Sequence, residues 1–305
     1  MTGSALVTGA RGFIGRHVAR HLAQLGWQVA GLGHGEWEAA ERLGWGVSRW
    51  QAADVSLENL VAAAGRPSLI VHCAGGASVG ISVERPHEDF HRTVSTTAAV
   101  LEFARTHAPE AAVVLPSSTA VYGNAGVLPT PESAPLAPVS PYGVHKQMAE
   151  QLCRFYSRQY GLRTAVVRFF SVYGPYLRKQ LLWDACERLS REEPPRFFGD
   201  GDETRDWLHV EDAARLLETA ARNAGGEAPA VNGGTGQPVR VREILAELFQ
   251  LLGRAGEPVF TGVGRPGEPK HYLADIAAAR SWGWAPRIDW REGLRQYVSW
   301  YRRAQ

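Results

Sequence analysis

The chain has 305 residues, of which 45% are hydrophobic and 21% are charged, and its formal net charge is +2. This ordinary globular composition suits one large domain or two coupled ones. Acidic and basic residues are interspersed, so no basic block indicates nucleic-acid binding, and no apolar run approaches the roughly 20 residues of a membrane span. The ten histidines show no metal-ligand spacing, so we expect no bound metal.

Three cysteines, Cys73, Cys153 and Cys186, are far apart and odd in number, which is typical of a reducing compartment. The N-terminus runs directly into an apolar segment at Ala5, without the basic region, apolar core and cleavage site of a signal peptide. We therefore expect a cytoplasmic protein.

Short apolar runs alternate with helical patterns through the first half of the chain. The expected strands are Ala5–Thr8, Gln28–Leu32, Leu69–Cys73, Ala112–Ser117 and Thr164–Phe170. The expected helices between and after them are Ile14–Leu25, Leu57–Ala64, Thr93–Thr106 and Val144–Tyr160. Runs that are apolar on both faces and joined by helices predict an α/β fold, with a doubly wound parallel sheet covered by helices on both sides.

The pattern changes after Gly174-Pro175, where turns and helices replace the regular alternation. The expected elements there are the helices Leu181–Ser190, Val210–Ala221, Val241–Leu252 and Trp290–Arg303 and the strand Ala230–Asn232. We expect residues 1–174 to form the sheet domain, with 209–234 returning to it. Residues 175–208 and 235–305 are then a smaller mixed α/β C-terminal domain that binds the substrate.

A glycine-rich turn follows the first expected strand and opens the first helix. Glycines at 9, 12 and 15 let the backbone turn tightly and approach a pyrophosphate, and the helix N-terminus offers free N–H groups to that anion. In this strand–turn–helix context the motif predicts a Rossmann-type site for NAD or NADP; the alternative is an ordinary glycine-rich turn. The expected cofactor contacts here are Gly9, Arg11, Gly12, Phe13, Ile14 and Gly15.

Dinucleotide sites usually place an acidic residue at the end of the second strand, to bind the adenosine ribose. Residues 30–34 read AGLGH and contain no acid. Without this acid nothing repels a 2′-phosphate, and Arg11 and His34 can contact one. NADP(H) is therefore a possible cofactor beside NAD. The alternative for Arg11 is a solvated residue at the start of the helix. Asp54 is either an adenine contact or the N-cap of the helix Leu57–Ala64. The remaining expected cofactor contacts are Val55, Cys73, Ala74 and Gly75.

Tyr142 and Lys146 are four residues apart at the start of a helix, so they share one face. A nearby ammonium stabilises phenolate, so we expect the pKa of Tyr142 to fall well below about 10 and the phenol to act as a general acid/base. Ser118, at the end of the fourth strand, can bind the oxygen that Tyr142 protonates. His145 is expected to point elsewhere and to have no special role. A tyrosine and a lysine at this spacing more often belong to an ordinary helix face. Together with the glycine turn and the serine-rich strand end, however, they favour a catalytic pair.

The chain resembles the extended short-chain dehydrogenase/reductase family, in its NAD-dependent epimerase/dehydratase branch. The resemblance covers nearly the whole length and depends on Gly9–Gly15, Ser117–Gly123, Tyr142–Lys146, Arg168–Pro175, Phe198–Asp212 and Arg265–Asp275. It implies Ser118, Tyr142 and Lys146 as catalytic residues, with Tyr142 and Lys146 also contacting the NAD(P) cofactor, and a nucleotide-diphosphate sugar as substrate.

The resemblance also implies a set of substrate contacts. These are Ser118, Thr119, Ser171, Phe198, Arg205 and Arg265. Phe198 matches the aromatic residue that stacks on the nucleotide base, and the two arginines match those that bind the diphosphate, for which guanidinium groups are suited; the alternative for each arginine is a surface salt bridge. Arg178 and Lys179, in the distinctive loop Tyr176–Trp183, either face a sugar phosphate or carboxylate or lie on a solvated turn.

The chain departs from the family pattern at four places. Thr119-Ala120 replace the Asp-Glu pair of sugar 4,6-dehydratases, which disfavours elimination of water. Thr93 and Ser171 replace asparagines, and the acid after the second strand is absent.

We therefore expect hydride transfer at C4 of a nucleotide-linked hexose, by a 4-epimerase with tightly bound NAD⁺. The runner-up is an NADPH-dependent reductase of a 4-keto-6-deoxy nucleotide sugar, which shares every catalytic residue. A cofactor-binding protein without catalysis is less favoured, because such proteins typically lose the Tyr or the Lys. By analogy with the family, the helices Thr93–Thr106 and Val144–Tyr160 are expected to form a homodimer.

Overall fold

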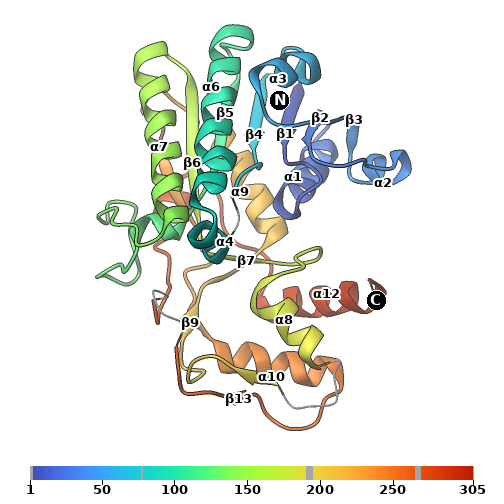
Figure 1. The fold of residues 1–305 in the computed structure, drawn as a ribbon, viewed down its shortest axis with the longest axis vertical. Coiled ribbons are helices and arrows are strands. Elements are labelled where there is room, and N and C mark those ends of the chain that lie inside the picture. Colours follow the sequence, from blue (N-terminus) through green and yellow to red (C-terminus); the bar gives the residue numbers. More distant parts are fainter. Residues whose placement is uncertain (1–2, 77, 190–194, 265–268, 305) are drawn as a thin grey trace.

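The computed structural model describes residues 3–76, 78–189, 195–264 and 269–304. Within these residues, seven strands form one parallel sheet in the order β11-β6-β5-β4-β1-β2-β3 (Figure 1). Their bounds are β1 (Ser4–Thr8), β2 (Gln28–Gly33), β3 (Val47–Ala52), β4 (Leu69–His72), β5 (Ala112–Ser118), β6 (Arg163–Phe169) and β11 (Ala230–Gly233). The predicted doubly wound parallel sheet is confirmed.

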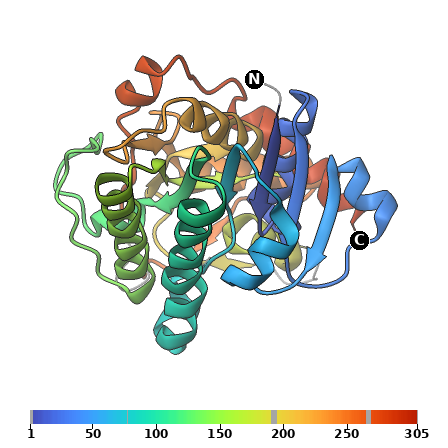
Figure 2. The ribbon, with the colours of Figure 1, turned by 90° about the horizontal axis from the view of Figure 1, so that it is seen from above.

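Helices cover both faces of the sheet. On one face, α1 (Phe13–Gln24) packs on α9 (Val210–Arg222), which also contacts β5 and β6. The other face carries α3 (Leu57–Ala64), α6 (Thr96–His107) and α7 (Pro141–Tyr160), and Figure 2 shows α6 and α7 side by side. Successive strand residues point to opposite faces, so Val7 joins the α1–α9 core while Leu6 joins the core under α3 and α6.

A second group of helices lies below the sheet in Figure 1, near α4 (Val79–Glu84). Its members are α8 (Gln180–Leu189), α10 (Val241–Leu252) and α12 (Trp290–Arg303), which enclose a separate apolar core that includes Ile244, Leu294 and Tyr297. Short strands pair in this part of the chain, as β7 (Ser171–Tyr173) with β10 (Trp207–His209), β9 (Thr204–Arg205) with β12 (Val239–Arg240), and β8 (Arg196–Phe197) with β13 (Val259–Phe260).

Most predicted elements lie within a residue or two of their observed ends, and β3 is the main strand that the sequence did not reveal. Of its residues only Val47 is buried, because β3 is an edge strand of the sheet. The helix predicted at Thr93–Thr106 starts earlier, as a π-helical segment over His91–Ser95 that leads into α6. The short helices α2 (Ala39–Gly44), α4, α5 (Pro86–Phe90) and α11 (Ala277–Ser281) were not predicted.

The start of α7 is defined by its capping residues. The Ser140 side chain accepts a hydrogen bond from Gly143 N at 3.2 Å, and Pro141 occupies the first helical position, where its missing N–H costs nothing. This places Tyr142 in the first turn. At the other end, Gly161 adopts the left-handed conformation, with φ 72°, of a helix C-cap. None of the helices in the described ranges is long and apolar enough to cross a membrane.

Candidate active site

The glycine-rich turn connects β1 to α1 with very close backbone contacts. Gly9 has φ 67° and Gly12 N donates a hydrogen bond to Gly9 O at 2.8 Å. A Cβ added at Gly9 would lie 2.8 Å from Ala74 N, and one added at Gly15 would collide with the Gly9 carbonyl and lie 2.9 Å from the Ala10 Cα. The glycines are therefore required by the turn itself, which leaves the N-terminus of α1 open to an anion.

We predict that the Gly15→Ala variant binds the dinucleotide at least about tenfold more weakly, a loss of about 1.4 kcal/mol. The added methyl group must push the Gly9 backbone away from its position, and overpacking of this kind also costs about 1–3 kcal/mol of stability. Fluorescence titration with NAD⁺ and urea unfolding measure the two effects. Gly44→Ala is the matched control, because nothing lies within 4 Å of its added Cβ; wild-type affinity in the Gly15→Ala variant would contradict the assignment.

The end of β2 carries the residues that we expected to face the adenosine. Arg11 Nη1 lies beside Gly35, 2.5 Å from where a Cβ would stand. His34 Nε2 and Asp54 Oδ1 are 2.6 Å apart, and both side chains are largely exposed. Asp54 is not the N-cap of α3, since Ser56 accepts the capping hydrogen bond from Asn59 N. Val55 is partly buried beside Asp54.

The loop after β4 joins the glycine turn to the catalytic helix. Ala74 N donates to the Thr8 hydroxyl at 3.2 Å, and Gly76 N donates to the Thr93 hydroxyl at 3.0 Å. Gly75 has φ 154°, and an added Cβ would lie 3.6 Å from Lys146 Nζ. The expected cofactor contacts Cys73, Ala74 and Gly75 thus lie between the glycine turn and Lys146.

The structure brings Ser118, Tyr142 and Lys146 together at the C-terminal end of β5 and the start of α7. Lys146 Nζ is 5.8 Å from the centroid of the Tyr142 ring, and it donates a hydrogen bond to Pro116 O at 3.1 Å. Burial raises the pKa of Tyr142, while its hydrogen bond with Ser118 lowers it. The expectation that the pKa of Tyr142 falls was therefore wrong for the protein alone, because the phenol is more strongly affected by loss of solvent than by its neighbours.

Lys146 is 7% exposed, and of the titratable groups around it the sequence predicted only Cys73 as part of the site. Burial lowers its pKa to about 8, against the opposing effects of Asp89, Cys73 and Glu150. His72, buried on β4, bonds the hydroxyls of Thr8 and Thr96. Lys146 therefore loses its proton more readily than an exposed lysine, because its ammonium group is removed from solvent.

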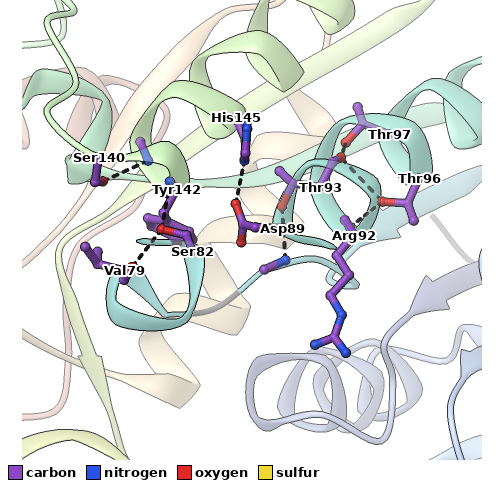
Figure 3. Close-up of polar contacts among 12 residues, drawn as sticks. Val79, Ser82, Asp89, Arg92, Thr93, Thr96, Thr97, Ser140, Tyr142 and His145 are labelled. Atoms are coloured by element: carbon purple, nitrogen blue, oxygen red, sulfur yellow. Dashed lines mark hydrogen bonds and ion pairs between the residues drawn. The ribbon is translucent and has the colours of Figure 1, made fainter. Parts of the chain in front are cut away.

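His145 has a defined partner, contrary to the sequence prediction. Its Nδ1 donates a hydrogen bond to Asp89 Oδ2 at 2.7 Å, and both side chains are nearly excluded from solvent (Figure 3). The nearby Tyr142 N donates to the Ser82 hydroxyl at 3.0 Å, which in turn donates to Val79 O. Helices α4 and α5 are thus both bonded to the first turns of α7.

The predicted substrate residues lie in different parts of the molecule. Thr119 begins a short 3₁₀ helix directly after Ser118, and Ser171 N bonds Asp206 O at 3.0 Å. Phe198 directly follows β8, and its side chain is 53% exposed. Arg205, on β9, donates to the Thr204 and Lys270 carbonyls and lies 4.9 Å from the centroid of the Tyr272 ring. Arg265 lies outside the described residues.

Side chains of the loop Tyr176–Trp183 contact other parts of the same chain. Tyr176, with φ 74°, lies under the Arg16 guanidinium at 4.4 Å, and Arg178 lies 5.9 Å from the Trp183 ring and 5.8 Å from the Trp300 ring. Lys179 is partly buried, and burial lowers its pKa. Across the described ranges, no group of three or more His, Cys, Asp or Glu side chains is placed to hold a metal ion.

A glycine turn that opens onto a tyrosine–lysine pair and a strand-end hydroxyl defines a dinucleotide-dependent enzyme of the short-chain dehydrogenase/reductase class. The chain belongs to the NAD dependent epimerase/dehydratase family, whose model matches residues 5–234. It is 31% identical over 97% of its length to the UDP-glucose 4-epimerase of Azospirillum brasilense, of which it covers 91%.

Two solved structures are also similar over their full lengths. The first is UDP-glucose 4-epimerase from Thermotoga maritima with UDP-glucose, at 29% identity and a TM-score of 0.88, with 99% of each chain covered. The second is MoeE5 in complex with UDP-glucuronic acid and NAD, at 30% identity and a TM-score of 0.88, with 99% of this chain and 100% of that chain covered. The predicted family is therefore confirmed.

Proposed function

We propose that this chain is an NAD-dependent 4-epimerase of a UDP-linked hexose. The observation that carries the proposal is the convergence of Ser118, Tyr142 and Lys146 beside the loop after β4. Relatives named UDP-glucose 4-epimerase and UDP-glucuronate 4-epimerase support the substrate class. The absence of the dehydratase Asp-Glu pair at Thr119-Ala120 is consistent with a reaction that eliminates no water.

The residues present fit a dinucleotide. A Cβ at Gly9 or Gly12 would lie only 2.8 Å or 3.0 Å from backbone atoms, so the turn is tight and carries no side chain at these two positions. The pyrophosphate can therefore approach the N–H groups at the start of α1. Arg11, His34 and Asp54 would hold the adenosine end, and Lys146 the ribose next to the nicotinamide. When bound, oxidised NAD supplies the hydride acceptor and a positive charge.

In the proposed mechanism the chain's own residues move one proton. Tyr142, as phenolate, takes the proton from the C4 hydroxyl as the C4 hydrogen leaves as hydride, which produces a 4-keto sugar. Ser118 donates a hydrogen bond to that oxygen, and Lys146 stabilises the phenolate. Once the keto sugar has rotated in the site, so that the opposite face of C4 would receive the hydride from the reduced dinucleotide, Tyr142 gives the proton back to the oxygen.

A second candidate is an NADPH-dependent reductase of a 4-keto-6-deoxy nucleotide sugar. The observation in its favour is Arg11, whose guanidinium lies beside Gly35 where a 2′-phosphate would be bound, together with the missing acid at residues 30–34. The two candidates differ in whether cofactor is regenerated or consumed.

The purified protein is expected to release NAD⁺ on acid extraction and to convert UDP-glucose or UDP-glucuronate into an equilibrium mixture with its C4 epimer, without added reductant. Proton NMR of the sugar anomeric signals follows the conversion. Stoichiometric oxidation of added NADPH with a 4-keto sugar would instead establish the reductase. Failure to change either UDP-sugar would contradict the proposed substrate class.

We further propose the division into a cofactor part (1–174 with 209–234) and a substrate part (175–208 with 235–305). The pairing of β11 with β6 and the separate apolar core of α8, α10 and α12 support it. We also propose a cytoplasmic homodimer formed through α6 and α7, for which the exposed Met148 and Phe155 on α7 offer apolar surface.

A further inference from the structure

One buried carboxylate connects three elements around the catalytic pair. Asp89, near the end of α5, is 5% exposed. Its Oδ2 accepts the hydrogen bond from His145 on α7, and its Oδ1 packs so closely on Gly76 that a Cβ there would collide with it. Asp89 is therefore bonded to α7, as Figure 3 shows, and packs against the loop that follows β4.

The backbone that follows Asp89 brings a second side chain to the same loop. His91–Ser95 form a π-helical segment between α5 and α6, a wide turn that is frequent at functional sites. Within it, Thr93 is 2% exposed, and its hydroxyl accepts the hydrogen bond from Gly76 N. Two buried residues, Asp89 and Thr93, thus contact Gly76. Gly76 follows Gly75, the glycine that lies near Lys146 Nζ.

We propose that the buried Asp89–His145 pair is a positioning pair for Tyr142 and Lys146, which holds the start of α7 against the loop after β4 and places a fixed negative charge near both catalytic side chains. This inference rests on the proposed function, because it takes the roles of Tyr142 and Lys146 from it. His145 directly precedes Lys146, so a bond that fixes its ring also restricts the backbone of Lys146.

The charge of Asp89 acts on both side chains in the same direction. Burial has the largest effect on the pKa of each, and Asp89 raises the pKa of Lys146 and of Tyr142. The other titratable groups that face Lys146 and Tyr142 are His72 and Cys73, from β4 and its loop, and Glu150 from α7. Around Asp89 lie His145 and the partly exposed Glu88 with Arg85 and Arg92. The Ser118 hydroxyl, from β5, bonds Tyr142. Removal of the Asp89 charge should therefore make Lys146 lose its proton at a lower pH.

The chain allows this titration to be observed directly. Its three lysines are Lys146, Lys179 and Lys270, so ¹³C-labelled lysine gives three side-chain NMR signals, of which a Lys146→Met variant assigns one. Asp89→Asn keeps an oxygen that accepts the His145 hydrogen bond and removes only the charge. His145→Asn keeps both the donor and the Asp89 charge, whereas His145→Val removes the donor. Glu88→Gln, on the same helix but with a side chain that is 37% exposed, is the matched control.

We expect the Lys146 midpoint, about 8 in the native protein, to fall by about one pH unit in Asp89→Asn and to stay in place in His145→Asn and Glu88→Gln. In His145→Val we expect kcat to fall about tenfold with little change in KM, and His145→Asn to restore most of it, because orientation rather than substrate affinity is lost. If Asp89→Asn does not fold, Gly76→Ala, whose methyl group displaces the carboxylate, is expected to shift the midpoint in the same direction.

A Lys146 midpoint that stays at its native value in the variant that displaces or neutralises Asp89 would overturn the proposal, even if the melting temperature falls, because a merely structural pair predicts that combination. The NMR titration needs no substrate. A protein that shows the shift but no epimerase activity would therefore refute the proposed function and leave the positioning pair standing.

Discussion

The Tyr142→Phe variant is expected to lose about 10²- to 10⁴-fold in kcat for C4 epimerisation, the typical contribution of a positioned general acid/base. The hydroxyl that is removed bonds Ser118, and it is the group that takes the C4 proton in the proposed mechanism. Lys146 remains to bind the ribose, so KM and the affinity for NAD⁺ are expected to change little. Steady-state kinetics with the substrate identified by the NMR assay, and an NAD⁺ titration, measure both.

The control for this experiment is Tyr160→Phe at the far end of the same helix. Tyr160 is 47% exposed, and its ring is tilted relative to that of Tyr156, with ring centroids 5.1 Å apart. Its hydroxyl takes no part in the mechanism, so activity should remain at the wild-type level. A Tyr142→Phe enzyme with kcat within tenfold of wild type, in a preparation that folds normally, would refute the proton-transfer role.

The second large effect is expected on the free energy of unfolding, at the buried ion pair of Arg168 and Glu150, which contacts Ser117 next to Ser118. The Arg168 guanidinium is bonded to both Glu150 oxygens, at 2.7 Å and 3.1 Å for the shortest contact of each, and its Nη1 also donates to the Tyr122 hydroxyl at 3.0 Å. Glu150 in turn accepts the Ser117 hydroxyl at 2.5 Å. Arg168→Met leaves the Glu150 carboxylate buried without its partner, which costs about 3–5 kcal/mol of unfolding free energy.

Urea unfolding of a double-mutant cycle separates the cost of the orphaned charge from the value of the pair. Adding Glu150→Leu to Arg168→Met removes both charges, and such apolar replacements are often neutral, so we expect most of the lost stability to return. Arg158→Met, which breaks the exposed Arg158–Glu227 pair, is the matched control and should change stability by less than about 1 kcal/mol. If Arg168→Met lost no more unfolding free energy than the Arg158→Met control, Glu150 would have to be solvated or protonated in the folded protein.

The sequence predicted the fold, and it predicted that Ser118, Tyr142 and Lys146 lie together, because both features are encoded locally. Alternating apolar runs define the central strands, and the four-residue spacing of Tyr142 and Lys146 defines their common helix face. The same spacing did not predict the pKa of Tyr142, since the loss of solvent around a phenol depends on every element packed over it. The edge strand β3 was missed for a related reason: with one buried residue it carries no periodic signal.

Contacts between distant segments account for most of what was missed at the site. Asp89 and His145 are separated by 56 positions, and neither has a sequence signal without the other. Helical periodicity likewise did not reveal the π-helical segment His91–Ser95, which directs the Thr93 hydroxyl toward Gly76, and it predicted an ordinary helix from Thr93. The substitution of Thr93 for the family's asparagine was recognised, but only the structure shows that its hydroxyl accepts the Gly76 N–H.

The order of the strands has a consequence for synthesis on the ribosome. β6 ends at residue 169, yet β11, its partner on the outer side of the sheet, spans residues 230–233. While the intervening chain is still being translated, the unpaired edge of β6 and its apolar residues are open to other strands, a situation that favours misassembly. A nascent chain arrested between these points should therefore recruit chaperones that the finished protein does not need.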